Sequence, residues 1–309
     1  MPELIMLVGL PGSGKSTYAA EYKEKGYHVH SSDQIREELY HDIQDQTHND
    51  KVFQTLHKRI KDDLKRGISC VYDATNLAMK RRIGFLRELK NIKCVKKCYI
   101  DLIPIEECKK RNAMRERRVP DEVIDKMVCR FDVPMWYEGW DHIHILTEDE
   151  VNYKFSMKEL YNFNQDNSHH TLSLSDHMFQ TAINISNKVL NSNIKENNKD
   201  VLITSALYHD IGKIITKSFI NLHGETTEEA HYYGHDHAGA YLYLLKCAYE
   251  DYDGLNYKHF YISSLINWHM RPYLGWKQSE KSRKRDRKLI GEEMYQDIML
   301  LHEADVAAH

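Results

Sequence analysis

The sequence predicts an α/β domain, built on a parallel sheet with helices on both faces, followed by an all-α domain. In the first half, apolar strand-like runs alternate with amphipathic helical segments, which is typical of parallel strands joined by helices. In the second half the strand signals vanish and helical periodicity dominates. A polar stretch separates the halves, so we place a first domain at 1–150, a linker at 151–168 and a second domain at 169–309.

The expected elements follow in chain order. Strands are expected at 4–8, 27–31, 68–72, 97–102 and 140–146. Helices of the first domain are expected from residue 33 and around 50–66, 80–90 and 105–117. After a short helix near 156–162, helices are expected at 175–191, 198–210, 236–249, 257–268 and 288–308.

Composition narrows the class of protein. A chain of 309 residues suits about two domains, and no run of 18 apolar residues exists to span a membrane. The start of the chain lacks a signal-peptide layout, and its six cysteines include no C-x-x-C pair. We therefore expect a protein of the reducing cytoplasm, with no membrane partner. The sequence carries no signal for an oligomeric state.

The net charge of −3 is unevenly distributed. Residues 1–150 hold 26 basic and 26 acidic side chains, whereas 151–309 hold 17 and 20. Strong non-specific binding to nucleic acid normally needs a basic face, which neither half provides. A local arginine cluster could still hold the end of one strand.

The sequence GLPGSGKST at 9–17 follows the apolar run LIMLV at 4–8. A strand, a glycine-rich turn and a helix start in this order form the context of a P-loop. Backbone N–H groups of such a turn surround a phosphate, and the helix N-terminus favours its negative charge. Lys15 would reach the β- and γ-phosphates, and Ser16 would ligate Mg²⁺. The predicted ATP–Mg²⁺ site comprises Gly9, Gly12, Ser13, Gly14, Lys15, Ser16 and Thr17.

Asp33 and Arg36 follow the second expected strand, where parallel sheets bind ligands. A carboxylate there can accept a proton from an attacking hydroxyl, and an arginine one turn later can hold a phosphate. Judged alone, Asp33 could equally be a helix N-cap.

Two further segments supply context. The segment DATN at 73–76 ends the third expected strand with an acid and a polar turn. In RNAMRERRVP at 111–120, the spacing predicts Arg111 and Arg115 on one helix face, ahead of a loop. Two such arginines suit a lid over a triphosphate, although a solvated basic helix is the alternative interpretation.

Together GLPGSGKST, SSDQIR, DATNLAMKRR and RNAMRERRVPDEVIDKM resemble the polynucleotide 5′-kinase branch of P-loop phosphotransferases. The resemblance covers most of residues 4–130. It implies that Asp33 is the general base for a 5′-hydroxyl and that Arg36 contacts the acceptor strand. Arg111 and Arg115 would be lid residues on the donor phosphates, and Asp73 would orient the P-loop or the substrate.

The second half contains HDIGK at 209–213 after an apolar helical run. Adjacent His and Asp offer a nitrogen and an oxygen ligand to a divalent metal, although such a dipeptide alone is weak evidence. Twelve of the 19 histidines fall after residue 150, so further ligands are available. The candidate ligands are His177, His209, Asp210, His235, His269 and Asp305.

This order of ligands resembles the HD-domain metal phosphohydrolases, over residues 168–309. The resemblance implies that one metal is held by His177, His209, Asp210 and Asp305. His235 and His269 would hold a second metal or the substrate phosphate, and Lys213 would neutralise that phosphate. Imidazole with carboxylate suits Mn²⁺, Fe²⁺, Co²⁺, Ni²⁺ or Zn²⁺ better than Mg²⁺ alone. Such ions lower the pKa of water for an in-line displacement.

Basic residues are dense at 277–288, between two of these candidate ligands. They could track an RNA or DNA backbone beside the metal site. A solvated loop and helix start is an equally good interpretation, because acidic residues interrupt the run.

Both resemblances together imply an end-healing enzyme acting on strand ends of RNA or DNA. Its first half would phosphorylate 5′-hydroxyls with ATP and Mg²⁺, and its second half would open or remove 2′,3′-cyclic, 2′- or 3′-phosphates. A ligase would act downstream. One alternative is a kinase of a small hydroxylated acceptor with an HD nucleotide phosphohydrolase. Another is a nucleotide-gated binding module with a vestigial second half.

Overall fold

The computed structural model describes residues 1–148, 150–167, 172–190, 196–250 and 254–308. The chain divides into two compact units. The first unit comprises Met1–Met127 and Pro134–Val151, and the second comprises Val128–Val133 and Asn152–His309. Within the described ranges, every helix is too short or too polar to cross a membrane.

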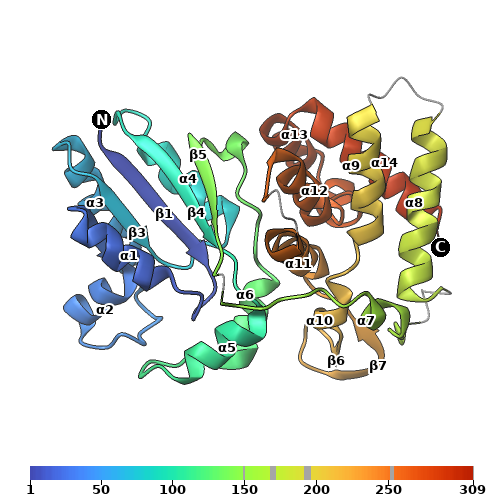
Figure 1. The fold of residues 1–309 in the computed structure, drawn as a ribbon, viewed down its shortest axis with the longest axis horizontal. Helices are drawn as coiled ribbons and strands as arrows, with labels where there is room; N and C mark the ends of the chain where they lie inside the picture. The colour runs from blue at the N-terminus through green and yellow to red at the C-terminus, as the bar shows by residue number, and fades with distance from the viewer. Residues whose placement is uncertain (149, 168–171, 191–195, 251–253, 309) are drawn as a thin grey trace. The chain divides into compact units, whose positions relative to one another are not determined.

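The first unit is built on a five-stranded sheet in the order β2-β3-β1-β4-β5 (Figure 1). All four strand pairs are parallel, which confirms the predicted α/β class. The strands are β1 (Glu3–Gly9), β2 (His28–Ser31), β3 (Cys70–Asp73), β4 (Val95–Asp101) and β5 (His142–Leu146). The central strand β1 is buried without alternation, as its unbroken apolar sequence requires.

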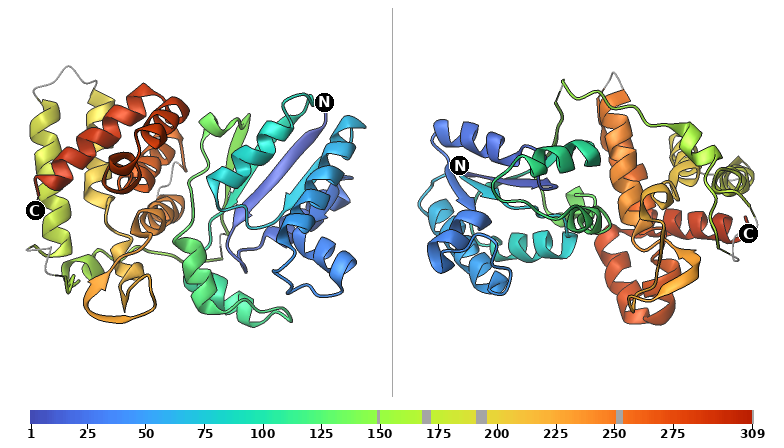
Figure 2. Two further views of the ribbon diagram at one scale, coloured as in Figure 1. Left: turned by 180° about the vertical axis from the view of Figure 1, so that it is seen from behind. Right: turned by 90° about the horizontal axis from the view of Figure 1, so that it is seen from below.

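Helices cover both faces of this sheet (Figure 2). Ala19 packs with Ile5, Leu7 and Val71 on one face, whereas the ring of Phe85 contacts Tyr72 on the other, with centroids 5.3 Å apart. The helices of the segment up to Val128 are α1 (Lys15–Glu24), α2 (Ser32–Tyr40), α3 (Asn49–Lys65), α4 (Met79–Glu88), α5 (Ile105–Ala113) and α6 (Asp121–Val128), with a short 3₁₀ turn η1 (Trp136–Glu138).

The helix predicted at 105–117 is shorter than expected. Helix α5 ends at Ala113, so the prediction that Arg111 and Arg115 share a helix face is wrong. The Asn112 side chain donates to the carbonyl of Val119 at 2.7 Å and accepts from its N–H at 3.1 Å. These two hydrogen bonds close residues 113–118 into a loop and end the helix.

A buried ion pair anchors the turn between β3 and α4. The side chains of Arg82 and Glu138 are fully buried and form two hydrogen bonds, of 2.8 and 2.6 Å. Arg82 also donates to the carbonyls of Asn76 and Leu77, in the turn that follows Asp73.

Truncation of Glu138 to alanine is therefore expected to destabilise the first unit by about 3–5 kcal/mol, because the Arg82 charge stays buried without its carboxylate. Urea unfolding at constant m-value measures this loss. The control is Glu38→Ala, which breaks the exposed pair of Glu38 with Arg59 and is expected to cost at most about 1 kcal/mol. Equal costs for both variants would contradict the prediction.

The second unit is predominantly helical, as predicted (Figure 2). Its helices are α7 (Met157–Tyr161), α8 (Leu174–Leu190), α9 (Glu196–Tyr208), α10 (Lys213–Thr216), α11 (His235–Glu250), α12 (Tyr257–Trp268), α13 (Glu280–Ile290) and α14 (Glu292–Val306), with a π-helical turn η2 (Pro272–Trp276).

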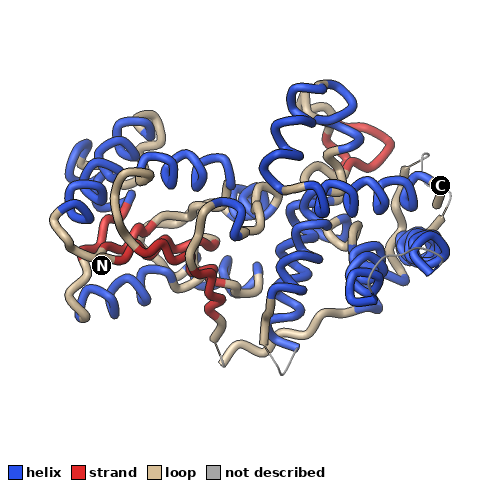
Figure 3. Tube along the Cα trace, turned by 90° about the horizontal axis from the view of Figure 1, so that it is seen from above, coloured by secondary structure: helices blue, strands red, loops and turns tan. Residues whose placement is uncertain are grey.

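Two features of this unit differ from the expectation. An antiparallel hairpin of β6 (Ser218–Ile220) and β7 (Thr226–His231) forms a separate two-stranded sheet (Figure 3). Its strands are short and β7 is polar, so the sequence shows no apolar alternation there. The helix expected at 288–308 is instead two helices, broken at Gly291, whose φ of 87° suits glycine.

Candidate functional sites

The glycine-rich turn has the backbone of a phosphate-binding loop. Gly12 and Gly14 have φ of 84° and 112°, and a Cβ on Gly12 would lie 2.3 Å from the carbonyl oxygen of Cys108. Glycine is therefore required at this position. Helix α1 begins directly after Gly14, so its first N–H groups face the turn. The Lys15 ammonium donates to the carbonyl of Leu10 at 2.6 Å within the same turn.

Two acids flank the P-loop at the carboxyl ends of β3 and β4. Burial raises the pKa of Asp73, against the opposing charge of Lys15 and a hydrogen bond from Ser16. Asp101 accepts a hydrogen bond from Ser13 at 2.7 Å. The sequence analysis missed Asp101, although the rule that selected Asp33, an acid at a strand end, applies to it equally.

Asp101 predicts a pH dependence of stability. Burial raises its pKa from 3.8 to about 6, although Lys15 and Ser13 lower it. Between these two values the folded chain binds the proton and the unfolded chain does not, so stability falls as pH rises through this window. The asparagine side chain of Asp101→Asn does not ionise, so the variant lacks this pH-dependent loss of stability. Its free energy of unfolding relative to wild type is therefore expected to rise, from low pH to above pH 6, by up to about 3 kcal/mol.

Urea unfolding of wild type and Asp101→Asn at about pH 4 and about pH 7.5 measures this difference. Asp125→Asn, at an exposed position on α6, is the control. A difference between wild type and Asp101→Asn that stays the same at both pH values would contradict the prediction.

Asp33 faces two arginines. The N-cap of α2 is Ser31, whose hydroxyl accepts from the Asp33 N–H at 3.3 Å, so the N-cap interpretation of Asp33 is wrong. One Asp33 oxygen pairs with Arg36 at 2.7 Å, and the other pairs with Arg117. The Asp33 side chain is 41% exposed, so an acceptor can approach it.

The loop after α5 brings further charge to the P-loop. Arg115 acts electrostatically on both Lys15 and Asp73, which places its charge near the triphosphate site. Arg117 contacts Asp33 from the same loop. Arg117 belongs to the segment predicted as a lid, but the sequence offered no reason to choose it among its neighbours.

Arg111 is held by carboxylates. Both of its terminal nitrogens donate to Glu148 at 2.7 Å, and its Nε donates to Glu107 at 2.8 Å. A Glu148 oxygen also lies 3.1 Å from the position of a Cβ built on Gly14, at the mouth of the P-loop. Glu148, which sequence reasoning missed, is therefore placed to compete with a triphosphate both for space and for Arg111.

Replacing Glu148 by glutamine is expected to tighten ATP binding about tenfold, because a negative charge leaves the phosphate site and Arg111 is released. Equilibrium titration with a fluorescent ATP analogue, in the presence of Mg²⁺, measures the dissociation constant. Glu106→Gln, on the exposed side of α5, is the matched control. Unchanged or weaker binding by the Glu148 variant would contradict the competition.

The six predicted metal ligands of the second unit converge from five helices. His177 lies on α8, His209 and Asp210 follow α9, His235 begins α11, His269 follows α12 and Asp305 lies on α14. All six are buried. Their donor atoms form two groups: His177, His209 and Asp305, and Asp210, His235 and His269.

The orientation of the histidines fits metal ligation. The Nδ1 atoms of His209, His235 and His269 lie 2.6–2.8 Å from backbone carbonyl oxygens three residues earlier. Each Nδ1 therefore carries the proton and leaves Nε2 as an acceptor, which is the arrangement of metal-binding imidazoles. The Nε2 atoms of His235 and His269 are 3.2 Å apart. Asp210 Oδ1 lies beside these two Nε2 atoms. Three acceptor atoms this close together are stabilised by a cation placed between them.

Asp210 stands between the two groups. Its Oδ1 lies 3.1 Å from His235 Nε2, and its Oδ2 lies 3.5 Å from the Nε2 atoms of His177 and His209. The sequence resemblance assigned Asp210 to the first metal, together with His177. In the structure this carboxylate reaches both groups.

The charges of the cluster favour a cation. Burial by itself lowers the pKa of His209, yet Asp210 and Asp305 raise it to about 9. Burial would raise the pKa of Asp305, but His209 and His177 hold it well below its ordinary range. Tyr273 orients Asp305 by donating a hydrogen bond of 2.8 Å. The cluster thus combines four imidazoles with two ionised carboxylates.

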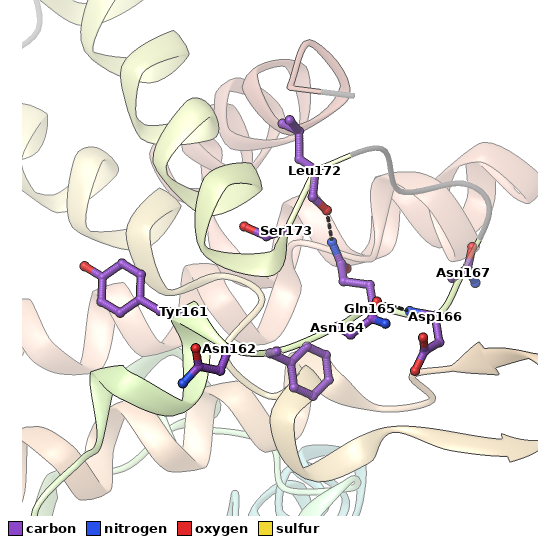
Figure 4. Close-up of a pocket in the computed structure, with 9 residues that line it drawn as sticks. Tyr161, Asn162, Asn164, Gln165, Asp166, Asn167, Leu172 and Ser173 are labelled. Carbon is purple, nitrogen blue, oxygen red and sulfur yellow. Dashed lines mark hydrogen bonds between the residues drawn. The ribbon is translucent and has the colours of Figure 1, made fainter.

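Lys213 connects this cluster to a surface hollow. Its ammonium lies 2.7 Å from Asp210 Oδ2 and donates to Gln165 Oε1 at 3.0 Å. Gln165 lines an open hollow together with polar neighbours such as Asn164 and Ser173 (Figure 4). Its amide also donates to the carbonyl of Leu172. Lys213 therefore links the cluster to the hollow through its hydrogen bond to Gln165.

The basic residues at 277–288 lie mainly on α13, and several are already paired. Arg283 binds Glu280 at 2.9 Å, and Arg287 binds Glu292 at 2.5 Å. Arg285 binds Asp286 at 2.9 Å. These pairs favour the solvated helix over a nucleic-acid track.

Family models match both halves of the chain. The model of an AAA domain matches residues 4–134, and the model of an HD domain matches residues 168–307.

Individual relatives match about half of the chain. L-seryl-tRNA(Sec) kinase of Methanococcus maripaludis is 28% identical over 177 residues, which cover 53% of this chain and 66% of that protein. Protein kti12 of Schizosaccharomyces pombe is 26% identical over 157 residues, covering 45% and 54%. The chain thus spans less than two thirds of either relative. A structure of the Pnkp1/Rnl/Hen1 RNA repair complex matches with 22% identity and a TM-score of 0.36, covering 42% of this chain and 43% of that one.

Proposed function

We propose that this chain, which joins an AAA domain of the P-loop kinase type to an HD domain, heals the broken ends of RNA. The first site would phosphorylate a 5′-hydroxyl with ATP, and the second would hydrolyse a 2′,3′-cyclic, 2′- or 3′-phosphate. The observation that carries the proposal is one chain holding a P-loop faced by Asp33 and a buried cluster of six metal-ligand side chains.

In the kinase reaction Asp33 would accept the proton of the 5′-hydroxyl as its oxygen bonds to the γ-phosphorus. The bond from that phosphorus to the β-phosphate oxygen breaks, and ADP leaves. Lys15 and Arg115 would offset the charge that develops on the phosphoryl oxygens. Mg²⁺, held by Ser16 with Asp73 behind it, would neutralise the phosphates.

In the hydrolase reaction the six side chains would hold one or two divalent metals, which supply an activated water and stabilise the phosphorane charge. Asp210 would orient both groups of ligands, because its two oxygens face different histidines. Lys213 would bind a phosphate oxygen of the substrate, held in place by Gln165. The polar hollow beside Gln165 offers amide groups to the neighbouring nucleotide.

RNA as the substrate is supported by the matched relative named as a kinase of L-seryl-tRNA(Sec). Pairing the two chemistries also has a reason in the substrate. A cleaved RNA that carries a 5′-hydroxyl and a 2′,3′-cyclic phosphate needs both changes before a ligase can seal it. We therefore expect a ligase as the downstream partner.

A single labelled RNA with a 5′-hydroxyl and a 2′,3′-cyclic phosphate tests the proposal. It is incubated with the protein, ATP, Mg²⁺ and Mn²⁺, and both ends are followed by gel mobility and mass. Matched reactions contain DNA with the same sequence, seryl-tRNA, or small hydroxylated acceptors.

Conversion of both RNA ends supports the proposal. Phosphorylation of only the small acceptors or of seryl-tRNA, with no change at the RNA ends, would replace it by a kinase of those acceptors. Conversion of DNA in preference to RNA would change the substrate class.

A further inference from the structure

A further group of side chains that could hold a metal lies in the first unit, away from the P-loop end of the sheet. It consists of His30 on β2, Asp63 on α3 and Cys70 on β3, whose donor atoms all lie within 4.8 Å of one another. His28, two residues before His30 on the same face of β2, contacts the same carboxylate. None of these side chains serves the kinase or hydrolase chemistry described above.

The contacts converge on one oxygen of Asp63. His28 Nδ1 and His30 Nε2 each lie 2.9 Å from Asp63 Oδ2, and the Cys70 thiol lies 3.9 Å from it. Zinc bond lengths of about 2.0–2.3 Å place tetrahedral donors about 3.3–3.7 Å apart. The separations of Asp63 Oδ2 from the two histidines and from Cys70 bracket that spacing. His28 lies outside the set of donor atoms that are all within 4.8 Å of one another, so its side chain must turn towards the other three to complete four ligands.

The charges of the four ligands would neutralise a buried divalent ion. Asp63 and Cys70 are buried, whereas the His28 side chain is 52% exposed and gives an ion a route from solvent. One carboxylate, one thiolate and two neutral imidazoles balance a divalent ion to zero net charge. A thiolate with imidazoles favours zinc over the oxygen-preferring Mg²⁺.

Arg66 does not occupy the same position. It pairs with the other carboxylate oxygen, Asp63 Oδ1, and its side chain is 65% exposed. The Cys70 thiol has one further contact, with the carbonyl of Ile68 at 3.6 Å. The oxygen that faces His28, His30 and Cys70 is therefore left to the candidate ligands.

We propose that His28, His30, Asp63 and Cys70 form a structural zinc site. The ion would join edge strand β2 to β3 and α3, with His28 directly opposite Cys70 in the strand register. These two strands end at the segments that carry Asp33 and Asp73. Zinc would thus fix the edge of the sheet that presents the acceptor side of the kinase site, independently of ATP.

Cobalt substitution tests the site in the full chain. Co²⁺ bound to a thiolate gives a near-ultraviolet charge-transfer band that imidazole and carboxylate ligands do not produce. The predicted HD-domain ligands include no cysteine, so metal bound there does not contribute to this band. Metal-stripped protein is titrated with Co²⁺, then with Zn²⁺ as competitor, and thermal unfolding is recorded with and without Zn²⁺.

The expected result is a charge-transfer band in wild type that Zn²⁺ displaces and that Cys70→Ser abolishes. The matched control Cys247→Ser removes a buried thiol of the second unit and is expected to leave the band intact. His30→Gln retains the thiol and is expected to weaken Co²⁺ binding at least tenfold, so it decides the matter if Cys70→Ser fails to fold. A folded wild type without the band, or a band that survives Cys70→Ser, would overturn the proposal.

Discussion

Replacing Asp210 by asparagine is expected to lower the proposed phosphate hydrolysis at RNA 3′ ends at least about 100-fold while leaving 5′ phosphorylation at the wild-type rate. Asparagine preserves the shape of the side chain but removes the charge that faces both groups of histidines. Loss of a residue that merely supports a metal ligand commonly costs 10–100-fold in affinity or activity, so loss of this ligand is expected to cost at least about 100-fold.

Initial rates on RNA ending in a 2′,3′-cyclic phosphate measure the loss, and metal analysis of the purified variant shows whether ligation has failed. The matched control is Asp297→Asn. Asp297 is also buried, but it accepts a hydrogen bond from Tyr261 at 2.7 Å and belongs to neither group of ligands. Full hydrolase activity of a folded Asp210 variant would contradict the assignment of the cluster as the hydrolytic site.

The two sites differ in how much the sequence revealed. The P-loop was recognisable because its function resides in one short segment, where glycines at fixed spacing permit φ values such as the 112° of Gly14. The predicted HD-domain ligands are far apart in the chain, and only their order was available. Their convergence depends on helix packing, which sets how Asp210 is shared between the two groups.

The loop at 113–118 shows why residue spacing alone did not predict the positions of the arginines. A spacing of four residues places Arg111 and Arg115 together only while the helix continues. The helix ends because the side-chain amide of Asn112 both donates to the carbonyl of Val119 and accepts from its N–H. These two hydrogen bonds hold the intervening residues in a loop. Glu148 illustrates the same limit, since its pairing with Arg111 joins residues 37 positions apart.

Replacing Asp33 by asparagine is expected to lower the rate of 5′ phosphorylation by about 10²–10⁴-fold, the range that general-base catalysis contributes. The P-loop contacts of Lys15 and Ser13 do not involve Asp33, so ATP affinity is expected to stay the same. Hydrolysis at the 3′ end is expected to be unaffected, because its ligands lie in the other unit. Glu38→Gln, on the same helix α2 and paired with Arg59, is the matched control.

The kinetics also separate two roles for Asp33, because this carboxylate binds Arg36 and Arg117 as well as being the proposed base for the acceptor. A general base contributes in the transition state, so its loss lowers kcat and leaves the KM for RNA nearly unchanged. A residue that only positions the two arginines would instead raise that KM, and the rate at saturating RNA would recover. Recovery of kcat in Asp33→Asn would therefore move the base to Asp73, the acid at the carboxyl end of β3, whose pKa is raised by burial.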